Sequence, residues 1–512
     1  MFDQSYVIGV DVGTSSTKSL LLNDRGLVLS SARVDHCLYS PVTDAAEQDP
    51  EEILAAVVQA IGQTVQTSQI PASQILGLSF STAIHGLIVI DAAGKPLTRC
   101  IIWADNRSAD WAEQVKRSPQ GSGIYHRTGT PIHPMSPLIK IIWLRQEYPE
   151  IFERTSKFIS IKEYIFYRLL NQFVIDYSIA SATGLLNLKS LTWDPEALDL
   201  AGISARHLSE LVPTTQVLKP IKAEFAAAMG ISPETPIVIG AGDGVLSNLG
   251  LGAIVPGTVA MTVGTSGAVR AVSDRPLTDP QERLFCYALT PDRWVVGGAT
   301  NNGGVILNWL RQQLSIETTH EALIQLAQTA PVGAGGLIFH PYLLGERSPL
   351  WQPEARGSFL GLTIHHSKAH LVRAVLEGIA FNLRMIFQVV QELTGPIHTI
   401  KAAGGLTASG LWQQVLADVF AQDILFPRER ESSGLGAVIL GLYALKVIDS
   451  LDVGFTSLSE VYRCQAIPAN VEVYQRIMAI YQQLLPGLQR EYGAIAQLQQ
   501  ELSGNPPTQL GN

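Results

Sequence analysis

Long apolar runs, paired cysteines and excess positive charge are all lacking in this chain, and each absence excludes a class of protein. The apolar run that most resembles a membrane span, Leu435–Leu445, is too short to cross a bilayer, which takes about 20 residues. The four cysteines are scattered, with no CxxC pair and no histidines at zinc-ligand spacing, so we expect reduced thiols and no zinc site. The formal charge of −9 argues against nucleic acid as a partner, because nucleic acid requires a basic face.

The first residues also lack the features of a secretion signal. Met1–Val10 contains no basic segment and is followed by Asp11, so we expect no signal peptide there. The run Leu435–Leu445 contains Gly436 and Gly441, which allow close packing and favour a buried helix. We therefore expect a cytoplasmic protein without a membrane partner.

The length of 512 residues predicts at least two domains, because single hydrophobic cores stop growing at roughly 250–300 residues. Strand-like runs are followed by helical runs in both halves, which predicts two α/β lobes with mixed sheets and helices outside. We place the lobes at residues 1–253 and 254–495, and expect a polar, disordered tail at 496–512. The runs that carry this prediction are Tyr6–Val10, Ile75–Phe80, Pro50–Gln66, Ile237–Gly240, Val259–Val263, Val269–Val272, His370–Leu393 and Gly410–Phe420.

A short motif occurs once in each predicted lobe. Val12-Gly13-Thr14-Ser15 recurs letter for letter as Val263-Gly264-Thr265-Ser266, and both copies lie between strand-like runs. Each copy is therefore predicted to be the tip of a β-hairpin, whose hydroxyl and N–H groups can bind phosphate oxygens. Asp11 precedes the first copy and Thr262 the second, so the first alone brings a carboxylate suited to Mg²⁺. The repeat indicates a duplicated phosphotransferase, although small residues also repeat by chance and such hairpins are often only turns.

A second glycine-rich segment follows a predicted strand. The chain contains no Walker A loop, and after Gly240-Ala241-Gly242 the third glycine of a dinucleotide fingerprint falls on Val245, which disfavours both kinds of nucleotide site. Asp243 lies where the carboxyl end of a strand opens into a ligand crevice. It can serve there as a general base for a substrate hydroxyl, or it can cap the following helix. The local sequence leaves both roles open.

Two longer patterns identify a family. Residues 135–147 match the first signature of the FGGY carbohydrate kinases throughout, and the second is matched from Gly357 to Glu377. The order of phosphate hairpin, GDG aspartate, second hairpin and late glycine pair also follows the family. The chain thus resembles FGGY kinases over nearly its full length. The resemblance implies two actin/hexokinase-like, ribonuclease H-like lobes with mixed sheets flanked by helices, and an ATP cleft between them.

The resemblance also implies roles for matching residues. Asp11 would organise Mg²⁺, and Asp243 would be the general base. Ile84 and His85 belong to the sugar-binding turn, and Ser409 stands where many relatives carry Asn or Lys. The residues expected to bind ATP are Thr14, Ser15, Lys18, Gly264, Thr265, Gly304, Gly404, Gly405 and Ser409.

Within the family, the stretches 103–108 and 127–137 look most like gluconate kinases. This implies a substrate site containing Trp103 and Asp105, and ATP-dependent phosphorylation of D-gluconate to 6-phosphogluconate. Because gluconate is an anion, the site needs a positive group, and Arg107 and His133 are the favoured candidates. Kinases of xylulose, ribulose or glycerol, and a non-catalytic nucleotide or sugar sensor, stay open as alternatives. Dimers are common among similar proteins. The full set of candidate carboxylate ligands is Arg107, Arg127, His133, Lys140 and Lys162.

Overall fold

The computed structural model describes residues 5–23, 26–313, 319–427, 431–452 and 461–503. The first lobe is built on a six-stranded mixed sheet in the order β13-β14-β5-β1-β2-β3. Strand β1 is antiparallel to β2 and parallel to β5, and β14 is parallel to β5. Helix α1 begins after Asp49, whose side chain accepts a hydrogen bond from the Glu51 amide. The bounds are β1 Tyr6–Val12, β2 Ser16–Asn23, β3 Val28–Asp35, α1 Pro50–Ser68, β5 Ile75–Thr82, β13 Val217–Leu218 and β14 Ile237–Gly242.

The second lobe repeats this arrangement. Its sheet has the order β17-β18-β16-β15-β21-β22-β23, and β15 is antiparallel to β16 and parallel to β21. The five neighbouring strands β18-β16-β15-β21-β22 thus reproduce the order and directions of β3-β2-β1-β5-β14 in the first sheet. Both predicted hairpins and the two mixed α/β lobes are confirmed. The bounds are β15 Thr258–Val263, β16 Gly267–Ser273, β17 Phe285–Thr290, β18 Arg293–Thr300, β21 Thr399–Ala403, β22 Ile424–Pro427 and β23 Val461–Cys464.

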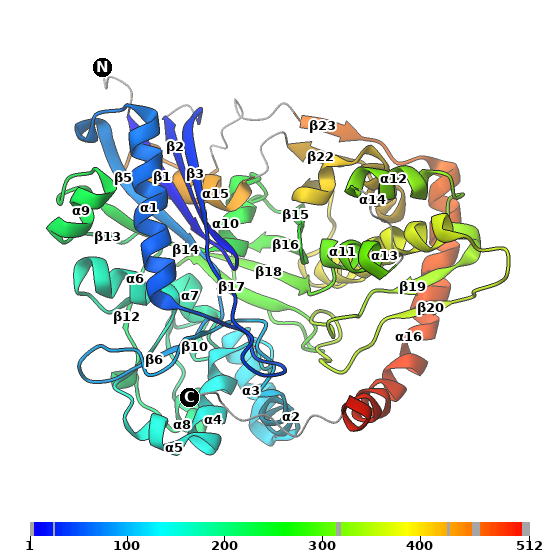
Figure 1. The fold of residues 1–512 in the computed structure, drawn as a ribbon, viewed down its shortest axis with the longest axis horizontal. Helices are drawn as coiled ribbons and strands as arrows, with labels where there is room; N and C mark the ends of the chain where they lie inside the picture. The colour runs from blue at the N-terminus through cyan, green and yellow to red at the C-terminus, as the bar shows by residue number, and fades with distance from the viewer. Residues whose placement is uncertain (1–4, 24–25, 314–318, 428–430, 453–460, 504–512) are drawn as a thin grey trace.

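Helices cover both sheets, and the two lobes lie side by side (Figure 1). Between β5 and β14 the chain forms a layer of short elements below the first sheet. Its helices are α2 Ala109–Arg117, α3 Pro119–Thr128, α4 Pro137–Glu147, α5 Pro149–Glu153, α6 Ile161–Leu170, α7 Tyr177–Ser181, α8 Pro195–Ala201 and α9 Ala223–Met229. The short strands are β6 Ile88–Ile90, β7 Cys100–Ile101, β8 Lys157–Ile159, β9 Val174–Asp176, β10 Leu186–Asn187, β11 Thr192–Trp193 and β12 Glu210–Val212. Strand β4 Glu47–Gln48 precedes α1 in the chain and pairs with β7. The later elements are α10 Asp243–Gly250, α11 Gly304–Gln313, α12 His320–Gln328, β19 Ile338–His340, β20 Ser358–Leu360, α13 Lys368–Thr394, α14 Gly410–Phe420, α15 Ser432–Ala444 and α16 Pro468–Ser503.

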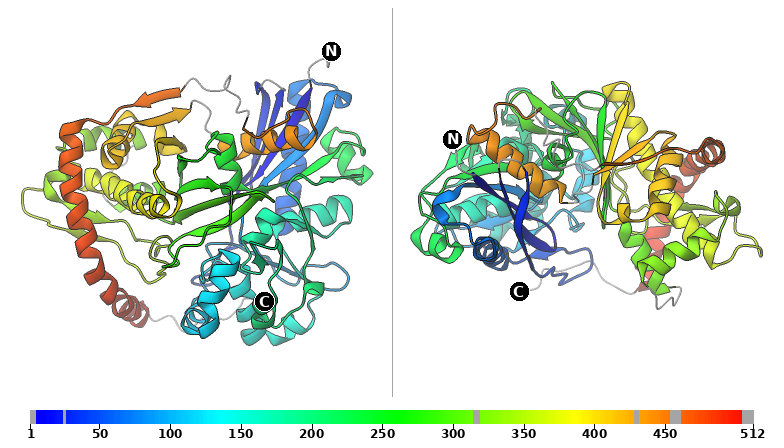
Figure 2. Two further views of the ribbon diagram at one scale, coloured as in Figure 1. Left: turned by 180° about the vertical axis from the view of Figure 1, so that it is seen from behind. Right: turned by 90° about the horizontal axis from the view of Figure 1, so that it is seen from above.

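Helix α15 lies in sequence between β22 and β23 of the second sheet but packs against the first sheet, as the two views of Figure 2 show. Gly434 and Val438 lie against Gly9 of β1, and Gly436 lies against the Leu246 carbonyl of α10. The expected buried helix is therefore confirmed, and its glycines provide the close approach. The proposed lobe boundary at 253/254 falls between β14 and β15, with α15 reaching back across it.

The close contact between α10 and α15 makes Gly436 sensitive to substitution. A Cβ atom on Gly436 would lie 1.9 Å from the Leu246 carbonyl oxygen. Gly436→Ala is expected to lower the free energy of unfolding by about 1–3 kcal/mol, the usual cost of overpacking. Urea denaturation measures this change in the free energy of unfolding. Gly493→Ala in α16 is the control, because a Cβ at that position meets open space. Equal stability of the two variants would contradict the packing described.

The last helix differs from the expectation at the C-terminus. Helix α16 continues to Ser503, so residues 496–503, predicted as part of a disordered tail, are helical. Their leucines, glutamines and glutamate are good helix formers. The prediction of disorder considered only the polarity of this segment and was wrong for these residues. Residues 504–512 lie outside the described residues.

Two expectations from composition concern the described residues. All four cysteines are free, with Cys37 exposed and the other three buried, as predicted. None of the helices in the described ranges combines the length and apolar character needed to span a bilayer.

Candidate active site

Two cavities contain many of the residues singled out by the sequence, and the glycine hairpins lie between them. The first cavity, about 780 Å³ including space open to solvent, is lined from both lobes. The second, about 2100 Å³ on the same measure, lies mainly over the second lobe. In the hairpin between β15 and β16, Gly264 and Thr265 line the second cavity, whereas Ser266 and Gly267 line the first. In the other hairpin, Thr14 faces the first cavity, and Lys18 on β2 faces the second.

Asp243 lies in the first cavity at the carboxyl end of β14. Gly240 creates a bulge before it, with a φ of 74° and so little space that a Cβ would lie 1.7 Å from the Phe80 carbonyl oxygen. Asp243 is the first residue of α10, after the N-cap Gly242, and its Oδ1 accepts the Gly244 amide at 2.6 Å. It is therefore not the N-cap of the helix, and its carboxylate faces the cavity.

The surroundings of Asp243 make its carboxyl group a stronger base. Burial raises its pKa to about 6, and the negative charge of Asp11 acts in the same direction. Arg270, the Gly244 amide and Arg347 oppose this rise. A carboxylate with a pKa near 6 is ionised at neutral pH and accepts a proton more readily than an ordinary aspartate.

This raised pKa predicts the acid limb of the pH profile. If Asp243 must be ionised to accept a proton, activity rises as the pH rises through about 6 and is level above it. Measuring kcat/KM for the acceptor between pH 4.5 and 8 gives the apparent pKa of the free enzyme. A limb at the ordinary aspartate value of 3.8, or none in this range, would contradict the assigned environment.

Asp11 is the last residue but one of β1. Its oxygens accept hydrogen bonds from Ser81 at 2.7 Å and from Ser433 at 2.9 Å, and burial raises its pKa. Nearby Lys18 forms a 2.6 Å salt bridge with Glu431. Among the described residues no group of three or more metal-binding side chains is found. A cation held by Asp11 would therefore take its other ligands from water and phosphate, as Mg²⁺ commonly does.

Side chains of the predicted sugar turn form one wall of the first cavity. His85 has a φ of 69°, its Nδ1 lies 2.8 Å from the Ala182 carbonyl, and its Nε2 lies 3.2 Å from the Tyr287 hydroxyl. A carbonyl can only accept, so Nδ1 is the donor and Nε2 accepts from the tyrosine. Burial lowers the pKa of His85 to about 3, so the ring is neutral. Ile84 also lines the cavity.

Trp103 lies on the same cavity wall and contacts both halves of the site. Its Nε1 donates to Thr14 Oγ1 at 3.0 Å, and the Arg347 guanidinium lies 4.9 Å from its ring centroid. The tryptophan therefore joins the first hairpin to a cation of the second lobe.

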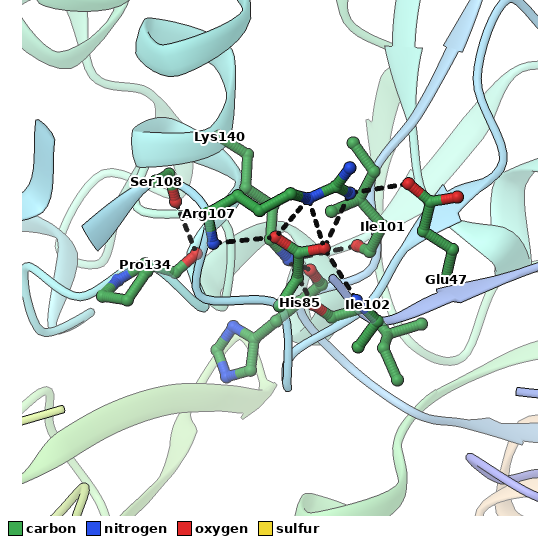
Figure 3. Close-up of polar contacts among 10 residues, drawn as sticks. Glu47, His85, Ile101, Ile102, Arg107, Ser108, Pro134 and Lys140 are labelled. Atoms are coloured by element: carbon green, nitrogen blue, oxygen red, sulfur yellow. Dashed lines mark hydrogen bonds and ion pairs between the residues drawn. The ribbon is translucent and has the colours of Figure 1, made fainter. Parts of the chain in front are cut away.

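The structure does not bring Arg107 into this cavity. Its guanidinium is paired with Asp105 at 2.7 Å and Glu47 at 2.6 Å, and its side chain is 4% exposed. Figure 3 shows the Arg107 guanidinium next to Glu47 and pointing away from the His85 ring. Asp105 is likewise absent from the cavity lining. The expectation that Arg107 binds a substrate carboxylate is therefore withdrawn, because two carboxylates already neutralise it.

His133 also lies outside the cavity lining. Its Nδ1 accepts the Met135 amide at 3.2 Å, and its ring packs against Trp351 with 5.4 Å between centroids. Burial lowers its pKa well below the ordinary value. A neutral imidazole offers no charge to an anion, so His133 serves the contact between the lobes.

The remaining basic candidates have internal partners as well. Lys140 Nζ donates to three main-chain carbonyls at 2.7–3.1 Å (Figure 3). Lys162 is paired with the buried Asp176 at 2.7 Å. Arg127 is paired with Asp194 at 2.8 Å and Glu196 at 3.0 Å. All three side chains therefore bind partners within the first lobe.

Sequence reasoning missed the cations that do line the cavity, Arg270 and Arg347. Arg270 lies two residues after Ala268 on β16, so both side chains lie on one face of the strand, but the sequence alone did not show that this face lines the cavity. Arg347 lies in a loop without regular structure, where no periodicity could have revealed it.

The second cavity contains most of the residues expected to bind a nucleotide. Gly404 has a φ of 115°, and a Cβ there would lie 2.3 Å from the Val263 carbonyl oxygen. Ser409 is the N-cap of α14. Ser15 is exposed at the hairpin tip and lines neither cavity. The expected residues found in the lining are Lys18, Gly264, Thr265, Gly304, Gly404, Gly405 and Ser409.

Comparison with known proteins agrees with this geometry. Residues 6–250 and 259–445 match the N- and C-terminal domains of the FGGY family of carbohydrate kinases. The chain is 48% identical over 510 residues to a gluconokinase of Bacillus licheniformis, covering 98% of this chain and 99% of that protein. Structures of a gluconate kinase and of a ligand-bound xylulose kinase, both from Lactobacillus acidophilus, each give a TM-score of 0.91 at 37% identity, covering 96% of this chain and 100% of theirs. The chain belongs to the FGGY family of carbohydrate kinases.

Proposed function

We propose that this carbohydrate kinase transfers the γ-phosphoryl group of ATP to the 6-hydroxyl of D-gluconate, with Asp243 as the general base. The observation that carries the proposal is the position of Asp243 in a cavity separated from the larger one by the two glycine hairpins. An acceptor in the first cavity and a nucleotide in the second would meet at these hairpins. In-line phosphoryl transfer requires that arrangement.

In the proposed transfer, one phosphorus–oxygen bond forms as another breaks. The 6-hydroxyl oxygen attacks the γ-phosphorus while its proton passes to Asp243. The bond between the γ-phosphorus and the oxygen bridging to the β-phosphate breaks, and ADP leaves. Because the transition state carries charge on its equatorial oxygens, the N–H groups around Gly13 and Gly264 are suited to stabilise it. Excluding water from the cavity between the lobes would protect the phosphoryl group from hydrolysis.

Asp11 is the residue that would hold Mg²⁺. Its carboxylate is buried with a raised pKa, and a bound cation would stabilise its ionised form. The ion would supply charge neutralisation for the phosphates. Lys18 lies between the hairpin and the second cavity and is suited to contact the same phosphates once released from Glu431.

The choice of gluconate is supported by the 48% identity to a gluconokinase and by the guanidinium groups of Arg270 and Arg347, which line the acceptor cavity. A ketose such as xylulose is the second candidate, favoured by the equally good match to the ligand-bound xylulose kinase structure. A neutral ketose, unlike a sugar acid, brings no negative charge of its own to these two guanidinium groups, which favours the sugar acid.

A coupled ADP-release assay with Mg²⁺ and ATP against gluconate, xylulose, ribulose, glycerol and no sugar tests the proposal. We expect strong turnover with gluconate alone. Turnover on a ketose instead would retain the role of Asp243 and reject the substrate. ADP release that no sugar accelerates would reject the kinase activity proposed and favour a sensor.

A further inference from the structure

We propose that Arg270 binds the carboxylate of the substrate and thereby makes the site select a sugar acid over a neutral polyol of the same length. This inference rests on the proposed function and assigns a residue to its specificity. It starts from the distribution of positive charge around the acceptor cavity.

Most basic side chains around the site are already neutralised. Arg107, Arg127 and Lys162 form salt bridges with carboxylates, and Lys140 donates to three carbonyl groups. In the part of the chain that the structure describes, neither Arg270 nor Arg347 forms a salt bridge. A buried cation without a paired anion is costly. The cavity therefore keeps two positive groups available for an anionic ligand.

Arg270 is more available than Arg347. The guanidinium of Arg347 lies over the Trp103 ring and donates from Nη2 to the Thr300 carbonyl at 3.2 Å. Arg270 donates from Nη1 to the Thr262 hydroxyl at 3.2 Å, and within the described residues Nε and Nη2 have no hydrogen-bond acceptor. An arginine offers a carboxylate two parallel N–H groups, and these are the ones that remain.

The main chain leaves room for the Arg270 guanidinium beside the catalytic aspartate. A Cβ on Gly244 would lie 3.0 Å from Arg270 Nη2 and 3.1 Å from Nε, so any side chain there would crowd the group. Burial lowers the pKa of Arg270 to about 10, while Asp243 acts in the opposite direction. The group is therefore still charged at neutral pH. Its side chain extends from β16 on the same face as Ala268, which also lines the cavity.

Comparing two substrates that differ in one group tests the inference. D-glucitol carries CH₂OH where D-gluconate carries its carboxylate. Arg270→Met is expected to lower kcat/KM for gluconate by at least about 10²-fold, because a buried charge pair loses one partner. Because Arg270 also opposes the rise in the pKa of Asp243, both substrates are compared at pH 8 and above, where Asp243 is ionised. There the same variant should change kcat/KM for glucitol by less than about threefold. Steady-state kinetics on both substrates gives the ratio.

Two further variants keep the test decisive. Arg270→Lys retains a charge but loses the two-pronged geometry, so an intermediate loss on gluconate alone is expected even if Arg270→Met folds poorly. Arg206→Met, at an exposed arginine outside the site, changes the net charge equally and should alter neither substrate. An equal loss on both substrates would overturn the inference, because Arg270 would then act on the phosphoryl group or on Asp243.

The outcome is separable from that of the proposed function. Failure of the wild-type protein to turn over gluconate rejects the proposed function itself. Normal wild-type turnover with an unchanged substrate ratio in Arg270→Met rejects only the role of Arg270. Calorimetric titration of gluconate into the wild type and Arg270→Met without ATP gives a second readout, and affinity should fall by a similar factor.

Discussion

Replacing Asp243 by asparagine is expected to lower kcat by about 10²–10⁴-fold, the usual contribution of a general base. Asparagine has nearly the same shape but cannot take a proton from the acceptor hydroxyl. The KM for ATP should change little, because the second cavity is lined by other residues. Steady-state kinetics with varied acceptor and varied ATP separates the two effects.

The matched control for this variant is Asp274→Asn, which removes the same charge at an exposed position outside both cavities. It should keep wild-type kinetics. In Asp243→Asn the acid limb near pH 6 should also disappear from the residual activity. Near wild-type turnover in this variant would reject Asp243 as the base.

The second large effect is expected at Asp11. Asp11→Asn should lower kcat/KM for ATP in the presence of Mg²⁺ by about 10²–10³-fold, because a metal ion contributes several kcal/mol to charge stabilisation. The loss should be partly recovered by raising the Mg²⁺ concentration. Ser81 and Ser433 now donate to different oxygens of Asp11. In the variant one serine hydroxyl can still donate to the amide oxygen and the other can accept from the amide NH₂ group, so the local structure should be retained. The assay is ADP release at a series of Mg²⁺ concentrations.

A second readout of Asp11→Asn follows from the coupling of the two aspartates. The charge of Asp11 raises the pKa of Asp243, so its removal should move the acid limb below pH 6. Asp274→Asn should leave the limb unchanged. A limb that stays in place, or a loss that does not depend on Mg²⁺, would contradict the arrangement around β1.

Local sequence patterns were sufficient for the parts of the site that depend on the main chain. The two hairpins could be predicted from strand-like runs interrupted by Gly13 and Gly264. The position of Asp243 at a strand end could be predicted because it comes directly after a buried strand. Such features depend on residues adjacent in sequence, so the pattern contains the information. The same holds for α15, whose small residues indicate close packing.

The ligands of the substrate anion depend on contacts between distant segments. Arg107 looked suitable until the structure placed Glu47 and Asp105 against it, and a partner 60 residues away in sequence leaves no local signal. Arg270 became a candidate only when the second lobe placed it beside Gly244. At the end of α16, by contrast, the information was present in the local sequence. The prediction relied on the polar composition of this segment and ignored its helix propensity.

Identifying the product tests the central claim most directly. Incubation of the protein with ATP, Mg²⁺ and D-gluconate, followed by ³¹P and ¹³C NMR, shows which carbon carries the phosphate. Asp243 lies in the first cavity, with the hairpins between it and the second. With the carboxylate of the substrate held at its other end, the account predicts 6-phosphogluconate and one ADP for each product molecule. Phosphate on another carbon, or ADP without a phosphorylated sugar, would contradict the account.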